Sequence, residues 1–465
     1  METTLKDKIS ELYGLHKEKI FSNDPPEVVD IREKSFNDFM KLDFPTTRLE
    51  SWKNTDMKKI LNRDYSINFE PEKDDIDHDK VFQCEIPDLD THVITLYNGW
   101  YINRDQPLLK LPNGTLIGSF AQALKEFPEL VLKYFNKYAN SELNGFNALN
   151  TAYAQDGVFI YVPDNAEAYK TIQMVNILNK EDNMFVQNRN LVVLGKNSKL
   201  TLIHCDDSHN HKSSLSNSVT EIFMDEGAQL KHYKLQNLND DTSLINSSFF
   251  HQEKDSNLAT FAISLNGGLI RNDIHVKLDG EGSHADVFGL YLTDKEQHVD
   301  NQVHIDHAKP NCTSNELFKG ILDDHGTAVF NGHILVRKDS QNTNAFQTNR
   351  NILLTDKATV YTKPFLEIYA DDVKCSHGAT VGQIDEAALF YIKSRGISEY
   401  NAKLLLMYAF AADVSNKITI NPLQERIDDL IKKRLRGELA ICDQCVLHCN
   451  NQEQEVEFKI DMSKI

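Results

Sequence analysis

LVVLGKNSKLTLI, residues 191–203, consists of two short apolar runs joined by turn residues. Both runs are rich in residues that favour β-strands, and Lys196-Asn197 between them is typical of a turn. From about residue 158 to 395 this character continues, because short runs of Val, Ile, Phe, Thr and Tyr alternate with polar residues. Helical periodicity is almost absent from this stretch, so it predicts a long, mainly β region.

The turns of this region recur at a nearly constant spacing. They begin at residues 196, 226, 256, 281, 325 and 356, and apart from one long and one short step they lie about 30 residues apart. Repeats of this length are typical of solenoids, in which each coil covers the next. A β-helix explains many short strands without helices between them, and a β-sandwich is the alternative.

Helical patterns lie on both sides of the β region. Leu5, Ile9 and Leu12 follow helical spacing near the start, and Leu423 and Ile427 line one side of a helix that begins at Asn421-Pro422. The domain organisation that we predict has a mostly helical N-terminal region at 1–155, a β core at 156–396, a helical region at 397–440 and a Cys-bearing tail at 441–465. Residues 68–90 are acidic and irregular, and they read as a linker.

Charge and cysteine content exclude several classes of protein. The 465 residues carry a formal charge of −19, and the longest basic run, Lys432-Lys433-Arg434, reads as the solvated last turn of a helix. Nucleic acid and anionic membranes are therefore poor partners. No run of 18 apolar residues exists, and no export signal is recognised at the N-terminus. Seven Cys residues in this context favour reduced thiols and a cytoplasmic location.

Cys375 and His377 form the most informative pair of residues. On an extended strand, side chains two positions apart point to the same face. A thiolate and an imidazole on one face can share Fe²⁺ or Zn²⁺. The alternative is a small buried cysteine beside a histidine with ordinary hydrogen bonds.

The segment around this pair resembles a known family. YADDVKCSHGAT (369–380) and LFYIKSRGI (389–397) are similar to the SufB/SufD family of iron–sulfur cluster assembly proteins, on its SufD side. Supporting similarity lies in FNALNTAYAQDGVFIYVP (146–163), in RNDIHVKLDGEGSHADVFGLYL (271–292) and in the stretch from Pro45 to Lys53. Together the resemblance covers about residues 40–437.

The resemblance implies a right-handed parallel β-helix core flanked by helical regions. It implies a non-enzymatic scaffold that pairs with a SufB-type subunit and docks a SufC-type ATPase through the C-terminal helices, with Leu404, Leu405 and Tyr408 as candidate contacts. It assigns His377, and with it Cys375, to the cluster-assembly interface. No tightly bound cofactor is implied for the isolated chain, only a transient iron–sulfur cluster shared with SufB.

Other candidate sites carry weaker patterns. Cys442, Cys445 and Cys449, with His448 beside them, have spacing that suits Zn²⁺ or an iron–sulfur cluster, and adventitious thiols are the alternative. The remaining histidines read as outward-facing polar positions of a solenoid: His204, His209, His211, His298, His304 and His307. No ATP-binding GxxxxGK[ST] motif is present.

Two further hypotheses remain open. One is a β-helix carbohydrate-active enzyme, although such enzymes are often exported. The other is a homodimer that uses the edge expected to pair with SufB.

Overall fold

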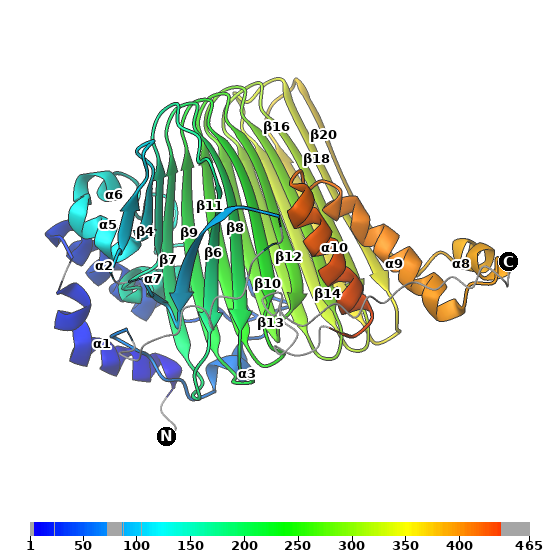
Figure 1. Cartoon of the computed structure of the whole chain (residues 1–465), viewed down its shortest axis with the longest axis horizontal. Helices are drawn as coiled ribbons and strands as arrows, with labels where there is room; N and C mark the ends of the chain where they lie inside the picture. Colours follow the sequence, from blue (N-terminus) through cyan, green and yellow to red (C-terminus); the bar gives the residue numbers. More distant parts are fainter. Residues whose placement is uncertain (1–3, 23, 72–85, 87, 104, 439–465) are drawn as a thin grey trace.

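The computed structural model describes residues 4–22, 24–71, 86, 88–103 and 105–438. Their centre is a stack of coils, and each coil contributes one strand to each of two ten-stranded sheets (Figure 1). Sheet I has the order β2-β1-β6-β8-β10-β12-β14-β16-β18-β20, and sheet II the order β19-β17-β15-β13-β11-β9-β7-β5-β4-β3. From β6 and β5 onward, neighbouring strands are parallel. The parallel β-helix is thereby confirmed, and the β-sandwich alternative is wrong.

The strands of the first part of the chain are β1 (Thr91–Tyr97), β2 (Trp100–Tyr101), β3 (Leu108–Lys110), β4 (Leu116–Ser119), β5 (Val158–Val162), β6 (Thr171–Leu178), β7 (Phe185–Leu194), β8 (Lys199–Ser208), β9 (Leu215–Met224) and β10 (Gln229–Asn237). They are followed by β11 (Ser243–Gln252), β12 (Asn257–Asn266), β13 (Leu269–Leu278), β14 (His284–Thr293), β15 (His298–His307), β16 (Thr313–Leu322), β17 (Thr327–Val336), β18 (Thr343–Leu353), β19 (Thr359–Ile368) and β20 (Val373–Gly382). The helices are α1 (Leu5–Phe21), α2 (Pro26–Leu42), the 3-10 turn η1 (Glu50–Trp52), α3 (Lys58–Leu61), α5 (Phe120–Glu126), α6 (Pro128–Tyr134), α7 (Gly145–Tyr153), α8 (Glu386–Ser394), α9 (Glu399–Ser415) and α10 (Asn421–Leu435).

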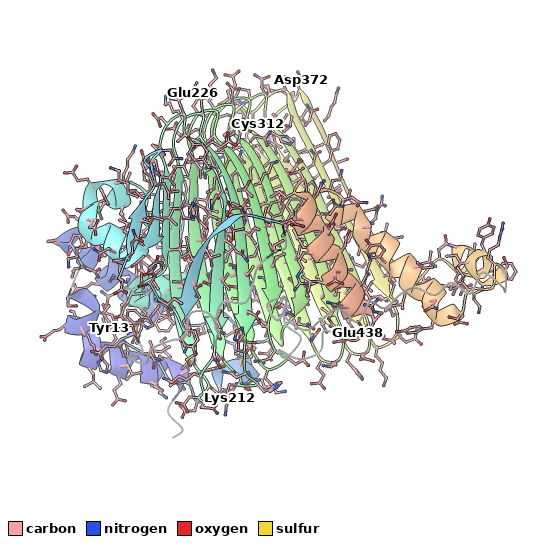
Figure 2. The ribbon with its side chains drawn as sticks, in the orientation of Figure 1. Tyr13, Lys212, Glu226, Cys312, Asp372 and Glu438 are labelled. Carbon is pink, nitrogen blue, oxygen red and sulfur yellow. The ribbon has the colours of Figure 1, made fainter. Side chains whose placement is uncertain are left out.

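One corner of the solenoid explains the 30-residue repeat. In six consecutive coils, from the turn between β7 and β8 to the turn between β17 and β18, the chain turns there on a residue in the left-handed region, with φ between 53° and 76°. Asn and Gly adopt this conformation most readily, and Asp follows. The six residues are Asn197, Gly227, Asp255, Gly282, Asn311 and Asn342. Figure 2 labels Glu226, Cys312 and Asp372, which follow one another along this edge.

The residue after each left-handed position is small and buried. These residues are Ser198, Ala228, Ser256, Ser283, Cys312 and Thr343. The Ser198 hydroxyl donates to the Gly195 carbonyl at 2.7 Å, which closes the turn locally. Cys312 therefore belongs to the corner, where burial raises the pKa of its thiol.

The irregular step in the predicted repeat has a simple cause. The turn at Pro310-Asn311 belongs to the same corner, but it is missing from the turns predicted from the sequence. The residues that follow it do not form an obvious β-rich run. The turns at 325 and 356 lie on the opposite corner, between β16 and β17 and between β18 and β19. The sequence pattern thus mixed two sets of turns.

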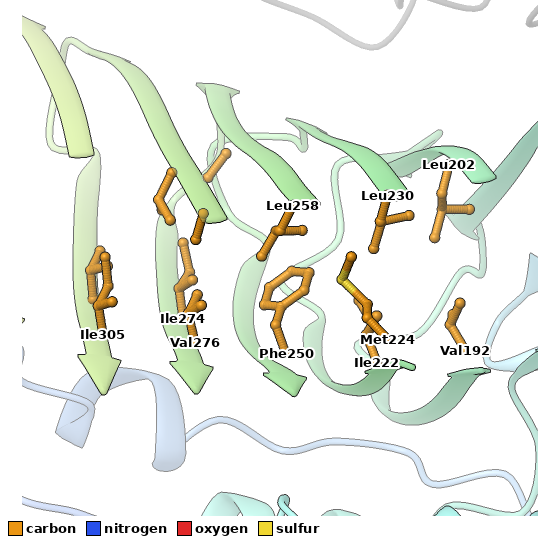
Figure 3. Packing of buried hydrophobic residues seen from close by; sticks show 14 of the residues in the cluster. Val192, Leu202, Ile222, Met224, Leu230, Phe250, Leu258, Ile274, Val276 and Ile305 are labelled. Atoms are coloured by element: carbon orange, nitrogen blue, oxygen red, sulfur yellow. The ribbon is translucent and has the colours of Figure 1, made fainter. Parts of the chain in front are cut away.

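The lumen between the sheets holds the main hydrophobic core. Leu202, Leu230 and Leu258 of sheet I face Met224 and Phe250 of sheet II (Figure 3). Each such fully buried side chain stabilises the fold by about 1.5–3 kcal/mol. Because the coils stack in register, these residues form continuous rows along the solenoid axis.

Part of the lumen is polar. The Lys234 ammonium lies 2.6 Å from the Asp206 carboxylate, and both side chains are buried. Burial lowers the pKa of Lys234. His204 and His307 also lie buried, so the expectation that they face outward is wrong. Their positions on the strands place them on the inner face, in line with Leu202 and Ile305.

The two ends of the stack differ. At the first coil, antiparallel β1–β2 and β3–β4–β5 finish the sheets, and α5, α6 and α7 pack beside them. At the last coil, β19 and β20 stand at the ends of their sheets. The apolar face of α9 and α10 covers the outer face of sheet I and leaves these edges uncovered (Figure 1).

The C-terminal helices are held to the solenoid by a buried arginine. Arg434 of α10 donates to the Leu265 carbonyl at 2.7 Å and to the Asp294 carboxylate at 2.6 Å. The expectation that the basic run around this residue is solvated is therefore wrong for Arg434. Arg434 is buried because it lies on the side of α10 that contacts Leu265. The composition of the basic run does not reveal which of its residues lies on that side.

A buried carboxylate on sheet II, Glu221 of β9, joins the N-terminal region to the solenoid. The Arg189 guanidinium lies 2.6 Å from the Glu221 carboxylate, and both side chains are inaccessible to solvent. Glu221 also accepts hydrogen bonds from the backbone N–H groups of Asn136, Tyr138 and Ala139. One carboxylate thus fixes the loop after α6 against sheet II.

We expect Glu221→Ala to lower the free energy of unfolding by about 3–5 kcal/mol, because it leaves the Arg189 charge buried without a partner. Urea titration followed by circular dichroism measures the change. Glu226→Ala is the matched control, since its pair with Lys196 is about half exposed and contributes at most about 1 kcal/mol. Equal losses in the two variants would contradict this account.

Candidate functional site

Cys375 and His377 both lie on β20, the last strand of sheet I. Cys375 is partly buried and packs against the lumen core, whereas His377 is exposed. Side chains two positions apart on a strand share a face, so both belong to the inner face of the last coil. That face is open here, because β20 stands at the end of its sheet.

Burial raises the pKa of the Cys375 thiol. The thiol is therefore protonated at neutral pH, and it binds a metal or sulfur species only after losing a proton. A cation brought to this face would favour that loss.

A polar row runs from His377 into the lumen. In register along sheet I, Gln347 of β18 lies next to His377, and Glu316 of β16 lies next to Gln347. The Gln347 amide donates to the Glu316 carboxyl at 2.8 Å. Burial raises the pKa of Glu316 to about 8, so its carboxyl is neutral at pH 7. We call Glu316, Gln347 and His377 the Glu316 row.

An apolar rim surrounds the open coil. Tyr369 is 60% exposed, and large apolar side chains on β18, β19 and β20, among them Ile368, are exposed as well. The others are Phe346, Tyr361, Phe365 and Val381. Sequence reasoning missed the rim. Its signal is the alternation of Tyr361 and Phe365 on β19, where an outer strand face normally carries polar residues.

The C-terminal helices expose a second apolar surface. α8 buries no residue, and its Phe390 is 75% exposed. Tyr391 and Tyr400 are exposed beside it. A groove of about 680 Å³ runs between α8, α9 and the last coils, lined by residues that include Ile384, Leu389 and Leu404.

The three candidate contacts on α9 point in different directions. Leu405 is 42% exposed, whereas Leu404 and Tyr408 pack against the cluster under α9 and α10. Lys432 lies over the Tyr408 ring at 4.8 Å from its centroid. Only Leu405 of the three is presented freely to a partner.

Cys442, Cys445, Cys449 and His448 lie outside the described residues. Within the described part of the chain, no group of three His, Cys, Asp or Glu side chains is placed to hold one metal ion. A metal at β20 would therefore need ligands from elsewhere in addition to Cys375 and His377.

The chain matches two family models along most of its length. The SUF system FeS cluster assembly SufBD core domain matches residues 176–410, and the SufBD protein N-terminal region matches residues 3–174. The chain belongs to the SufBD family. Membership places it in the SUF system of iron–sulfur cluster assembly.

Several relatives support the SufD side of the SufBD family. A SufBD family iron–sulfur cluster assembly protein of Synechocystis is 28% identical over 91% of this chain and 95% of its own length. Escherichia coli SufD is 35% identical over 52% of this chain and 58% of its own length. Bacillus subtilis SufD is 26% identical over 72% of this chain and 79% of its own length. These likenesses disfavour the carbohydrate-active alternative.

Among the described residues, no helix is both long and apolar enough to cross a bilayer. This agrees with the absence of long apolar runs in the sequence. Helices such as α1, α9 and α10 bury one face against the solenoid or against one another.

The raised pKa of Glu316 makes stability depend on pH. In the unfolded chain this group ionises near pH 4.5, whereas in the folded chain it stays neutral up to about pH 8. Its contribution is therefore fully present below pH 4.5 and is lost as the pH rises towards 8. Each unit of pKa difference corresponds to about 1.4 kcal/mol.

We expect Glu316→Gln to remove this loss, because the amide is neutral at every pH. The variant should gain at least about 1 kcal/mol relative to the parent between pH 5 and pH 8. Urea midpoints of both proteins at these two pH values measure the difference. If the difference in stability between the two proteins were the same at pH 5 and at pH 8, Glu316 would have to be ionised in the folded protein already at pH 5.

Proposed function

We propose that this chain is a SufD-type scaffold subunit that is not itself an enzyme. It pairs with a SufB-type subunit through the last coil, docks a SufC-type ATPase through the C-terminal helices, and supports assembly of a transient cluster. The observation that carries the proposal is the open last coil, where Cys375 and His377 lie within an apolar rim.

The last coil has the properties of a subunit interface. Exposed strand edges offer unpaired N–H and C=O groups to another strand, and proteins usually block them. Here the edge carries exposed aromatic side chains, including Tyr361 and Phe365, in addition to charged ones such as Lys363. A second solenoid can continue both sheets and bury this rim.

Cys375 and His377 supply an incomplete ligand set. Iron–sulfur clusters are usually held by four protein ligands, mostly thiolates with occasional imidazoles. Two side chains from β20 leave the remaining ligands to the SufB-type partner. The isolated chain should therefore hold no tightly bound cofactor, and the cluster would be shared across the interface.

The C-terminal helices fit the docking of the ATPase. α8 presents Phe390 and Tyr391, and only three residues, Gln383 to Asp385, separate it from β20. A movement of the docked ATPase would pull directly on the strand that carries His377. This short link supports mechanical coupling between nucleotide turnover and the interface.

The SufD assignment within the family depends on the Cys375-Ser376-His377 motif and on the relatives named SufD. A cytoplasmic location remains a prediction from the sequence. Without a SufB-type partner, the same open edge is available to a second copy of the chain.

Two variants should separate the two partner surfaces. Val381→Asp places a charge on the open edge, and Phe390→Asp places one on α8. Loss of one buried apolar anchor costs about 2 kcal/mol or more, roughly thirtyfold in affinity. After co-expression with SufB-type and SufC-type subunits, Val381→Asp should lose SufB and keep SufC, and Phe390→Asp the reverse.

Tyr169→Asp provides the control for this experiment, because Tyr169 is exposed just before β6, at the first coils of the stack. It should keep both partners. Retention of SufB by Val381→Asp at wild-type level would contradict pairing through the last coil. Retention of SufC by Phe390→Asp would contradict docking at α8.

We expect His377→Ala to fold normally, since the side chain is exposed. The reconstituted complex should hold at least about tenfold less cluster, a loss like that seen when metal-site support is removed. Iron and sulfide content and visible absorption measure it. Lys374→Ala, on the opposite face of the same strand, is the control, and wild-type cluster content in His377→Ala would refute the role.

A further inference from the structure

A row of histidines crosses the outer face of sheet II. His275 of β13, His304 of β15 and His333 of β17 occupy equivalent positions on neighbouring strands. They alternate with inward residues such as Val303 and Ile305, so they point away from the lumen. All three lie on strands before the last coil, and only His333 contacts β19, through Glu367 and the rim residue Phe365.

Two of these rings converge. The Nδ1 atoms of His304 and His333 lie 2.9 Å apart, although the residues are 29 positions apart in the chain. On the other side of its ring, the His333 Nε2 lies 3.1 Å from a Glu367 carboxylate oxygen on β19. The side chains of His333 and Glu367 are 30% and 36% exposed, so solvent reaches the pair.

The carboxylate fixes the protonation pattern of His333. Because a carboxylate only accepts hydrogen bonds, His333 donates from Nε2 to Glu367. Its Nδ1 therefore carries a lone pair directed at His304. Histidines that bind metals usually donate their other N–H to a carboxylate in this manner, which orients the ring and increases its basicity.

The surroundings keep His304 neutral. Burial, together with the nearby His275 and His333, lowers the pKa of His304 to about 4. Aromatic rings close the row at both ends, with Phe249 4.8 Å from His275 and Phe365 4.6 Å from His333 between ring centroids. A neutral imidazole is the form that binds metal.

We propose that His304 and His333 form a binding site for a divalent transition metal, with Glu367 as the residue that positions His333. Imidazole nitrogens bind Zn²⁺ at about 2.0–2.1 Å, so two ligands of a tetrahedral ion lie roughly 3.3 Å apart. The two Nδ1 atoms need to separate by only a few tenths of an ångström. The metal takes the place of the hydrogen between the rings: His304 releases its Nδ1 proton to water and takes one up at Nε2, so both rings stay neutral.

The site supplies two protein ligands. No third His, Cys, Asp or Glu converges with them among the described residues, so water completes the coordination. This composition predicts a labile site, suited to ions that imidazole binds well, such as Fe²⁺, Zn²⁺ and Co²⁺. The site differs from Cys375 and His377 in both its sheet and its face.

Titration of the full-length chain with Zn²⁺ by calorimetry, and with Co²⁺ by absorbance, tests the proposal. Thiolate ligands give Co²⁺ an intense charge-transfer band that imidazole ligands do not, which separates this site from the tail cysteines. We expect His304→Asn and His333→Asn each to remove the component without that band. Glu367→Gln should weaken it by about 10–100-fold.

His284→Asn is the matched control, because His284 is a half-exposed histidine near a carboxylate, Asp286, without a second histidine opposite it. It should bind as the parent does. Unchanged binding in both His304→Asn and His333→Asn, or a parent chain without a thiolate-free component, would overturn the site. Unchanged affinity in Glu367→Gln would overturn the role of that carboxylate.

Thermal melting without metal checks that the variants fold. Pairing with the SufB-type subunit should persist in His304→Asn, because this residue lies on neither β19 nor β20. Loss of metal binding and loss of pairing are therefore measured separately. Failure of one proposal leaves the other standing.

Discussion

The in-register stacking of one coil on the next is the constraint on which this structure depends. Every strand inside the stack satisfies its backbone groups on both sides, and every side chain lies beside its equivalents on the neighbouring coils. One left-handed residue marks this corner in six consecutive coils, from Asn197 to Asn342, and recurs about every 30 residues. Gly227 illustrates it, because a Cβ atom there would lie 2.4 Å from the Asn197 side-chain oxygen.

Stacking of this kind necessarily produces two ends, and the protein treats them differently. Antiparallel strands and helices close the first coil, whereas β19 and β20 leave the last coil open. Cys375 and His377 lie at the open end, together with exposed aromatic side chains such as Tyr361 and Phe365. The same principle builds rows of like residues, and it turns Glu316, Gln347 and His377 into a continuous polar row.

Some features of the site follow directly from the sequence. Cys375 and His377 share a face because they are two apart on a strand, and the run of short apolar segments is enough to expect that strand. The orientation of α9 was harder to predict. Its residues are apolar almost all round, so the pattern alone does not tell that Leu404 and Tyr408 pack inward while Leu405 faces out.

By itself, the sequence determined the family, the parallel β-helix and the placement of Cys375 and His377 on one face of the same strand. These features depend on local motifs and on alternation within one strand. Only the tertiary structure decided which strands end the stack, that Arg434 is buried, and that His304 meets His333 next to Glu367. Contacts between coils depend on the register of strands about 30 residues apart. That register is set by the lengths of all the turns between them, and a change of one residue moves a side chain from one face to the other.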